Sequence, residues 1–161
     1  MPDAALSPVA LALGRVPTGL YVVTALTPAG PLGFVATFVV QVGFAPPTIS
    51  VAVGHGRAPL AAMRATGRFA VSILDAASSR LMGAFFKKYA EGTSPFDHVE
   101  HTPAPDGGAP VLSGALAWLD CRVAGEHETG DHVVVFGEVT AAALAREGEP
   151  SVHLRKNGLG Y

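Results

Sequence analysis

Cysteine and charged residues are scarce in this sequence. The first shortage excludes an internal disulfide, and the second is unusual for a monomer. The one cysteine, Cys121, has no partner for an internal disulfide, which is typical of proteins from a reducing compartment. Charged residues make up 15% of the 161 positions, whereas hydrophobic residues make up 49%. So few charges favour an oligomer that buries one apolar face. The net charge of −2 comes without a basic run, so nothing indicates a nucleic-acid partner.

The sequence also shows no segment that would direct it to a membrane or hold it there. No positive charge precedes Arg15, although a secretory signal begins with basic residues. The longest apolar run, Leu32 to Val53, is nearly long enough to span a bilayer, but Gln41 and the Pro46-Pro47 pair interrupt it. We therefore expect a cytoplasmic protein without a membrane partner.

Motifs for metal binding and for nucleophilic catalysis are missing as well. There is no His-Glu-x-x-His, and His98 and His101 stand in a proline-rich segment without further ligand candidates. No serine occupies a nucleophile elbow, and Cys121 alternates inward on a predicted strand, which favours core packing. A chain without these groups needs a cofactor if it is to perform chemistry.

The most informative stretch runs from Gly33 to Val53. It consists of two apolar, β-branched runs, predicted as strands, on either side of Pro46-Pro47, which cannot donate hydrogen bonds inside a central ladder. Thr37 and Gln41 are the polar residues of the first run, and the period of two places them on one face with Val39 between them. They would bind the edge of a planar heterocycle, or they are satisfied polar groups of a core or subunit interface. The residues alone leave both interpretations open.

Strand follows strand through turns along the rest of the chain. Patterning predicts a helix that Ser7-Pro8 opens and Gly14 closes, with Leu6, Val9, Ala10 and Leu13 on one face. Further predictions are strands at 19–27, 69–74, 115–126, 132–144 and 152–154, helices at 60–66 and from Asp75 to about Tyr89, and a loop at 90–110. On strand 115–126, Cys121 faces one way and Asp120 the other. Because crossover helices are missing, we expect one mainly β domain, residues 1–161, built as an antiparallel β-barrel with flanking helices.

Two turns carry further candidate residues. Gly54 to Pro59 follows a strand and opens a helix, but proline in place of the third glycine excludes a Rossmann fingerprint. Such a loop can still offer amides and a helix dipole to a phosphate, with Arg57 adding charge, although an ordinary turn has the same pattern. The turn Gly130-Asp131-His132 places a histidine where it would touch a nucleotide or redox ring, or remain solvated.

Taken in order, these segments resemble the flavin reductase-like family of FMN-binding split barrels over nearly the full length. The resemblance rests on Thr18–Thr24, Ala36–Phe38 through Pro46-Pro47, Gly67–Leu74, Gly130-Asp131-His132 and Arg155–Tyr161. The ending Arg-Lys-Asn-Gly-Leu-Gly-Tyr and the Val40-Gln41 pair are most similar to the flavin reductase modules of diflavin flavodiiron proteins. The resemblance implies an antiparallel split barrel of Greek-key type.

The resemblance also implies an activity and a site. The expected protein is a homodimeric NAD(P)H-dependent flavin reductase that transfers a hydride from the nicotinamide to N5 of FMN or FAD. It would supply reduced flavin or electrons to a partner such as a monooxygenase or a redox protein. His132 is implied as the catalytic residue that seats the nicotinamide. The implied cofactor-binding residues are Val35, Ala36, Thr37, Phe38, Gln41, Val42, His55, Arg57, Ala58, Arg155, Tyr161 and, on its charge alone, Lys88.

Departures from the family pattern keep other hypotheses open. Many members carry serine or threonine where this chain has Gly43 and Ala58, which bears on the affinity for the phosphate. One alternative is a flavoprotein that retains FMN and relays electrons to a protein partner with little NAD(P)H activity. Another is a barrel that binds a different ligand and catalyses nothing. No 2′-phosphate clamp can be assigned, so NADH and NADPH are both retained as co-substrates.

Overall fold

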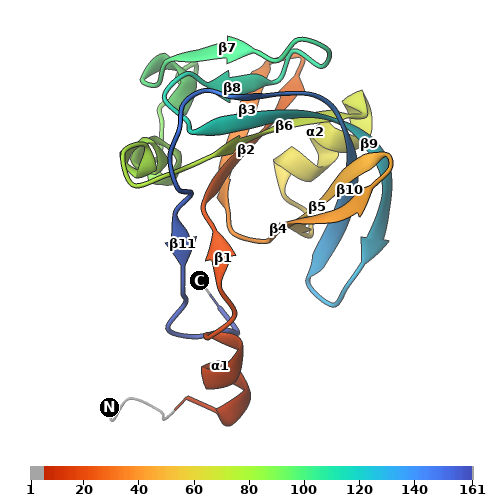
Figure 1. Ribbon diagram of the computed structural model, residues 1–161. Helices are drawn as coiled ribbons and strands as arrows, with labels where there is room; N and C mark the ends of the chain where they lie inside the picture. The colour runs from red at the N-terminus through yellow and green to blue at the C-terminus, as the bar shows by residue number, and fades with distance from the viewer. Residues whose placement is uncertain (1–5, 161) are drawn as a thin grey trace.

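The computed structural model describes residues 6–160. Seven strands form one antiparallel sheet in the order β3-β2-β6-β9-β10-β5-β4 (Figure 1). They are β2 (Tyr21–Thr27), β3 (Gly30–Ala36), β4 (Val39–Phe44), β5 (Pro47–Gly54), β6 (Arg68–Ile73), β9 (Ala117–Glu128) and β10 (His132–Leu144). Two short antiparallel pairs join β1 (Thr18–Gly19) to β11 (Val152–His153) and β7 (His101–Pro103) to β8 (Pro110–Leu112). The helices are α1 (Pro8–Leu13), α2 (Ala58–Thr66) and the 3-10 helices η1 (Ser79–Phe86) and η2 (Pro95–Asp97).

The two edge strands of the large sheet, β3 and β4, follow each other directly in the chain. Only Thr37 and Phe38 separate the end of β3 from the start of β4. Three Cα-to-Cα steps span at most about 11 Å, so the sheet has to curl until its first and last strands meet at this corner. Among the described strands no ladder joins β3 to β4, so the barrel stays open along this line. The predicted mainly β, antiparallel split barrel is therefore confirmed.

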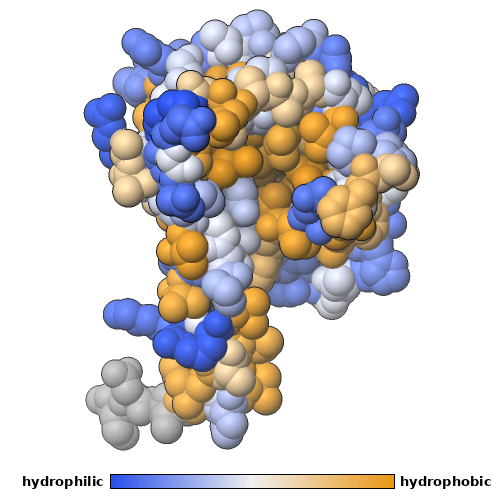
Figure 2. Space-filling model, in the orientation of Figure 1, coloured by the Kyte–Doolittle hydropathy of each residue, from blue (hydrophilic) through white to orange (hydrophobic). Residues whose placement is uncertain are grey.

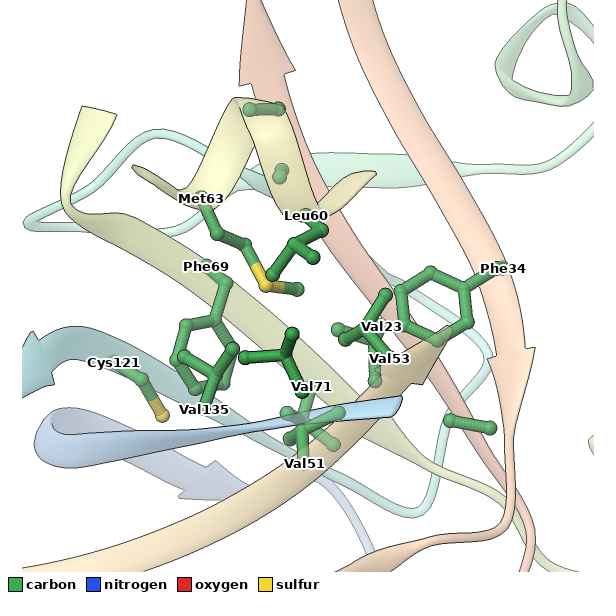
Figure 3. Packing of buried hydrophobic residues seen from close by; sticks show 14 of the residues in the cluster. Val23, Phe34, Val51, Val53, Leu60, Met63, Phe69, Val71, Cys121 and Val135 are labelled. Carbon is green, nitrogen blue, oxygen red and sulfur yellow. The ribbon is translucent and has the colours of Figure 1, made fainter. Parts of the chain in front are cut away.

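The interior of the curled sheet holds one cluster of buried apolar side chains (Figure 3). Helix α2 contributes Leu60 and Met63, which pack with Phe69 of β6. Cys121 of β9 belongs to the same cluster, and burial raises the pKa of its thiol to about 12. Its predicted role in core packing is confirmed, because a thiol with this pKa stays protonated at neutral pH.

The segment predicted as a loop, residues 90–110, is mostly irregular, but it also contains η2, β7 and the first residue of β8, so the prediction holds only in part. Phe96 and Val99 from this segment are buried in a second apolar cluster with Val22, Leu74 and Leu112. Since Val23 next to Val22 faces the barrel interior, this cluster covers the outer face of β2.

The predicted α-helix from Asp75 to about Tyr89 was also wrong, since the 3-10 helix η1 takes its place. The Asp75 carboxylate does accept a capping bond from the Ser78 amide at 2.9 Å. It also accepts two hydrogen bonds from Arg146, both at 2.7 Å, and Asp75 forms a β-bridge with Pro150. These long-range contacts hold the main chain at Asp75 extended, and Gly83 disfavours a regular helix further on.

Asp120 faces away from Cys121 on β9, as predicted, but its side chain is buried rather than solvated. Its carboxylate accepts hydrogen bonds from the amides of Asp106 and Gly107, at 2.8 and 2.9 Å. Arg68 lies 3.5 Å from the other carboxylate oxygen. The segment before β8 covers this face of β9 and supplies the donors, which is why alternation gave the face of Asp120 but not its burial.

Helix α1 and the β1–β11 pair form a stalk, residues 7–19 with 152–153, that projects from the barrel (Figure 1). As predicted, Ser7 caps α1, since its hydroxyl accepts a hydrogen bond from the Ala10 amide. Of the predicted face only Ala10 is buried, whereas Val9 and Leu13 are exposed. Figure 2 shows hydrophobic residues on the stalk and in the recess beside it. No helix within residues 6–160 is long and apolar enough to cross a bilayer.

Candidate functional site

The corner between β3 and β4 opens into a hollow of about 800 Å³, called here the main hollow. Its walls come from the base of the stalk, the corner itself, β4, β5, the β9–β10 turn and the residues that lead into β11. This volume lies within the range of about 300–1,000 Å³ for small-molecule sites. The main hollow is therefore the first candidate for a ligand site.

Apolar walls and a polar rim characterise the main hollow. Val39, Ala52 and Val134 provide flat apolar surface from three neighbouring strands. Hydroxyl groups and one carboxylate stand around it, contributed by Thr18, Thr37, Ser50, Thr129, Ser151 and Asp131. A planar heterocycle suits this arrangement, since apolar walls pack against its faces while polar groups bond its edge.

Arg155 closes the corner from the segment after β11. Its Nη2 donates a hydrogen bond of 2.7 Å to the Thr37 hydroxyl, and its guanidinium carbon lies 4.0 Å from the centroid of the Phe38 ring. A cation over an aromatic face is attracted by the ring quadrupole. Residues distant in the chain thus hold each other in place at the corner.

His132 lies at the start of β10 and contacts the corner from the other side. Its ring meets the Phe38 ring edge-on, with centroids 5.8 Å apart and an interplanar angle of 81°. Its Nδ1 lies 2.8 Å from the Asp131 carboxylate. The hydrogen bond with His132 lowers the pKa of Asp131, and the charges of His132 and of the more distant His55 act in the same direction. Asp131 thus fixes the orientation of the imidazole ring beside the hollow.

A small hollow of about 160 Å³ adjoins the main one and shares Thr37, Ala52 and His132 with it. Arg57 lines it, with its guanidinium carbon 5.4 Å from the centroid of the Phe34 ring. Arg57 precedes α2 and has no side-chain capping bond. Two amides of this loop are already bonded, since His55 donates to the Asp131 carbonyl and Arg57 donates to the Gly54 carbonyl. The charge of Arg57 and the N-terminus of α2 therefore offer more to an anion than these two loop amides do.

Two further hollows lie on the other side of the corner. The outer hollow, about 690 Å³, is lined by Thr37, by part of η1 and by the segment after β11. The linking hollow, about 260 Å³, is bounded by Phe38, His132, Arg155 and residues 158–160. Thr37 lines the main, small and outer hollows, and Arg155 lines the outer and linking ones. The corner is thus the wall that all four hollows share.

Seven of the residues singled out in the sequence meet around this corner. They are Val35, Ala36, Thr37, Phe38, Arg57, His132 and Arg155. Five others line none of the four hollows, namely Gln41, Val42, His55, Ala58 and Lys88. Tyr161 lies outside the described residues.

The expectation that Thr37 and Gln41 share one face of a strand was wrong. The chain turns between Ala36 and Val39, so Thr37 lies at the corner and Gln41 on the separate strand β4. Thr37 is buried, whereas Gln41 is exposed and donates a hydrogen bond to the Gly43 carbonyl at 3.2 Å. The sequence around Thr37 has no glycine or proline to indicate such a corner.

Some residues of the main hollow carried no signal in the sequence. Asp131 was present in the Gly130-Asp131-His132 turn, but its contact with His132 was not predicted. The base of the stalk and residues 150–152 reach the hollow only through the pairing of β1 with β11. Within residues 6–160 no group of three or more His, Cys, Asp or Glu side chains is arranged to hold a metal ion.

Comparisons with known proteins point to one family. Residues 13–158 match the family model described as "Flavin reductase like domain". The chain is 38% identical to "Diflavin flavoprotein A 1" of Synechocystis over 152 residues, which are 93% of this chain and 26% of that protein. It is 38% identical to "FMN reductase (NADH) SmoA" of Agrobacterium fabrum over 141 residues, 86% of this chain and 76% of that protein. The chain thus spans about a quarter of the length of the diflavin relative.

A solved structure agrees in fold along nearly the whole chain. "NADH:FAD oxidoreductase SgcE6" of Streptomyces globisporus superposes with a TM-score of 0.83 and 29% sequence identity, covering 97% of this chain and 96% of that one. The overall architecture of this chain therefore has an experimental counterpart.

Proposed function

The chain belongs to the flavin reductase-like domain family, and we propose that it is an NAD(P)H-dependent flavin oxidoreductase whose main hollow binds FMN beside His132. The observation that carries the proposal is the corner, where Thr37 and Phe38 are held by Arg155 on one side and contacted by His132 on the other. SmoA, named an FMN reductase, and SgcE6, named an NADH:FAD oxidoreductase, support the choice of flavin and NADH. We treat residues 1–161 as one flavin-binding domain.

The residues of the main hollow suit an isoalloxazine ring. Val39, Ala52 and Val134 would pack against the faces of the ring, and the hydroxyls of Thr37 and Ser50 would bond its polar edge. Val35 and Ala36 precede the corner in β3 and line the adjoining small hollow. A site of this kind holds a planar ring in one orientation, which is the main requirement for hydride transfer.

The phosphate of FMN would lie toward the small hollow. Arg57 supplies a positive charge there, and α2 begins at the next residue with the positive end of its dipole. Gly43 and Ala58 line none of the hollows, so the proposal assigns the phosphate to Arg57 rather than to side chains at these two positions. Arg57 is the residue on which this part of the proposal depends.

When bound, the flavin supplies the redox chemistry, since its N5 accepts the hydride that the nicotinamide gives up. The chain itself would bind the flavin and the nicotinamide and hold their rings in the orientation that the reaction needs. His132, held by Asp131, would seat the nicotinamide against the ring, and the apolar walls of the main hollow would keep water away from the reacting atoms. Hydride transfer does not require a side chain to act as a general acid or base. This agrees with the small number of polar side chains at the corner.

We further propose a cytoplasmic homodimer that passes reduced flavin or electrons to a monooxygenase or a redox protein. Val9, Leu11 and Leu13 of α1 are exposed, and so are Val40 and Phe44 of the edge strand β4. A six-residue helix is too short to be stable alone. A second copy of the chain that packs on the stalk would bury its exposed apolar side chains and so stabilise it.

Steady-state oxidation of NADH and NADPH with added FMN or FAD tests the proposed activity. Turnover that depends on flavin is the expected result, and a purified protein that accelerates neither nicotinamide would reject it. A protein that is coloured as purified but slow with free nicotinamides would instead indicate a flavoprotein that relays electrons. Light scattering after size exclusion tests the dimer, which predicts twice the mass of 16.4 kDa.

A further inference from the structure

Helix α1 lies outside the proposed flavin site, and the proposed hydride transfer gives it no role. No residue of α1, Pro8–Leu13, lines any of the four hollows. Within this helix Ala10 alone is buried. Figure 1 shows the segment after β11 turning past the end of α1 before the chain reaches its C-terminus. The contact between these two segments is a route by which α1 can act on the site.

Backbone atoms from both ends of the chain make this contact. The Ala10 carbonyl accepts the helical hydrogen bond from the Gly14 amide and a second one from the Gly158 amide, both at 3.0 Å. Arg15 follows directly and donates from its Nη2 to the Arg155 carbonyl at 3.2 Å. Two hydrogen bonds therefore tie the end of α1 to the segment after β11.

Gly14 and Gly158 allow the two segments to come this close, and we call this pair the glycine contact. A Cβ on Gly14 would lie 2.8 Å from the Arg155 carbonyl oxygen. A Cβ on Gly158 would overlap the Cβ of Leu13 and lie 2.7 Å from the Gly14 nitrogen. Close-packed atoms do not approach each other so closely, so a side chain at either position has to push the segments apart.

The backbone conformation of Gly14 does not require glycine. Its φ of −63° and ψ of −11° lie in the right-handed region, which alanine also adopts. Alanine is also the better helix former. Local structure thus favours alanine at position 14, and the close approach of the Arg155 carbonyl is the physical reason for glycine there.

Arg155 connects the glycine contact to the corner. Its carbonyl accepts the hydrogen bond from Arg15, whereas its guanidinium donates to the Thr37 hydroxyl and lies over the ring of Phe38. The ladder between β1 and β11 ends at His153, two residues before Arg155. The main chain at residue 155 is therefore held by the end of α1 rather than by the ladder.

We propose that α1 is a positioning element for the corner, and that the glycine contact sets the place from which Arg155 reaches Thr37 and Phe38. Moving the main chain of Arg155 draws its guanidinium away from both residues, and the ring-binding site is then less well ordered. Gly14 lines none of the hollows, so it acts on a ligand through Arg155. As far as it concerns FMN, this inference rests on the proposed function.

Titration of FMN into the wild type and Gly14→Ala, followed by flavin fluorescence, tests the inference. The Kd of the variant should rise about tenfold, as for loss of one hydrogen bond to a charged group. Gly125→Ala is the matched control, because a Cβ there meets open space and Gly125 lines none of the hollows. Gly14→Ala with the wild-type Kd overturns the inference.

A double variant separates positioning from a general structural effect. If Gly14→Ala acts through the hydrogen bond between Arg155 and Thr37, it should change the Kd less than about twofold when Thr37 is already valine. The same factor in both backgrounds overturns the inference, because the effect then bypasses this bond. Gly158→Ala is the second variant, since it pushes the same segments apart from the other side and should show the same dependence on Thr37.

Light scattering after size exclusion excludes an effect through the proposed dimer. Gly14→Ala should keep the mass of the wild type. A smaller mass that accompanies the weaker binding overturns the inference, because loss of the partner copy would then explain the change in Kd.

Urea unfolding without FMN makes the inference and the proposed function fail separately. Thr37→Val should lower the unfolding midpoint of the wild type and shift that of Gly14→Ala less, because the bond to Arg155 is already lost there. Coupled midpoints in a protein that does not bind FMN would reject the function and leave α1 as the element that positions Arg155. Independent midpoints in a protein that reduces FMN would overturn the inference alone.

Discussion

The Arg155 guanidinium donates a hydrogen bond of 2.7 Å to the hydroxyl of Thr37, a residue 118 positions earlier in the chain. The same guanidinium lies over the ring of Phe38, so one side chain contacts both residues of the corner between β3 and β4. The segment after β11 and the corner therefore position each other. A ligand in the main hollow depends on both.

Replacing Thr37 by valine removes the acceptor and keeps the shape of the side chain. We expect the free energy of unfolding to fall by about 1–2 kcal/mol, because a hydrogen bond to a charged donor is lost. The affinity for FMN should fall as well, since the corner is no longer held in place. Thr37→Ser keeps the hydroxyl and should behave like the wild type in urea unfolding and in FMN titration. Identical behaviour of the valine and serine variants would show that the bond to Arg155 is irrelevant.

His132→Ala should weaken the binding of NADH more than it slows the hydride transfer. If the imidazole seats the nicotinamide, its loss raises the KM for NADH by about tenfold while kcat changes less, because mainly binding is removed. His127→Ala is the control, since His127 is exposed on β9 and lines none of the four hollows. Steady-state kinetics at fixed FMN measure both constants, and a KM that stays at the wild-type value would contradict the assignment.

Asp120→Ala should be strongly destabilising. The change leaves the amides of Asp106 and Gly107 without their acceptor and Arg68 without its buried carboxylate, at a cost of about 2–4 kcal/mol. Glu138→Ala removes a carboxylate of a solvent-exposed pair with Arg122 and should cost less than about 1 kcal/mol. Urea unfolding compares the two variants. Equal losses would mean that Asp120 does not anchor the segment before β8.

The pair of Asp75 with Arg146 should make stability depend on pH in the acid range. Hydrogen bonds from Ser78, and then from Arg146, lower the pKa of Asp75 from 3.8 to about 2 in the folded protein. A carboxyl group whose pKa is lower in the folded state stabilises it above its unfolded value, and this contribution is lost as the pH falls from about 4 to 2.

Asp75→Asn tests that dependence. Urea unfolding at steps between pH 5 and pH 2 should show a steeper loss of stability in the wild type than in the variant over this window. Glu126→Gln serves as the comparison, because Glu126 pairs with Arg64 at an exposed position. Parallel curves for wild type and Asp75→Asn would rule out the contribution of this carboxylate.

The strands were predictable where local pattern and turn chemistry agree. The strand from His132 to Leu144 has the predicted bounds, because apolar alternation resumes directly after the Gly130-Asp131 turn. The Pro46-Pro47 break correctly separates β4 from β5. By contrast, the burial of Asp120 depends on donors from a segment that the sequence shows only as a proline-rich loop. Long-range contacts of this kind have no local pattern.

The sequence pointed to several of the residues that meet at the corner, but not to their geometry. Thr37, Phe38, His132 and Arg155 were all singled out, yet nothing local indicates that they meet at one corner. That meeting depends on the curl of the whole sheet, which brings β3 and β4 together, and on the β1–β11 pair, which carries Arg155 to Thr37. Gln41 was misplaced for the same reason, since no glycine or proline around Thr37 indicates the turn after Ala36.

The visible spectrum of the purified protein with equimolar FMN, recorded without oxygen before and after NADH, tests the central claim most directly. The account predicts that FMN stays with the protein on ultrafiltration and that its oxidised absorbance disappears after NADH is added, faster than for free FMN. FMN that passes through the membrane unbound, or bound FMN whose absorbance is unchanged by NADH and NADPH, would contradict it.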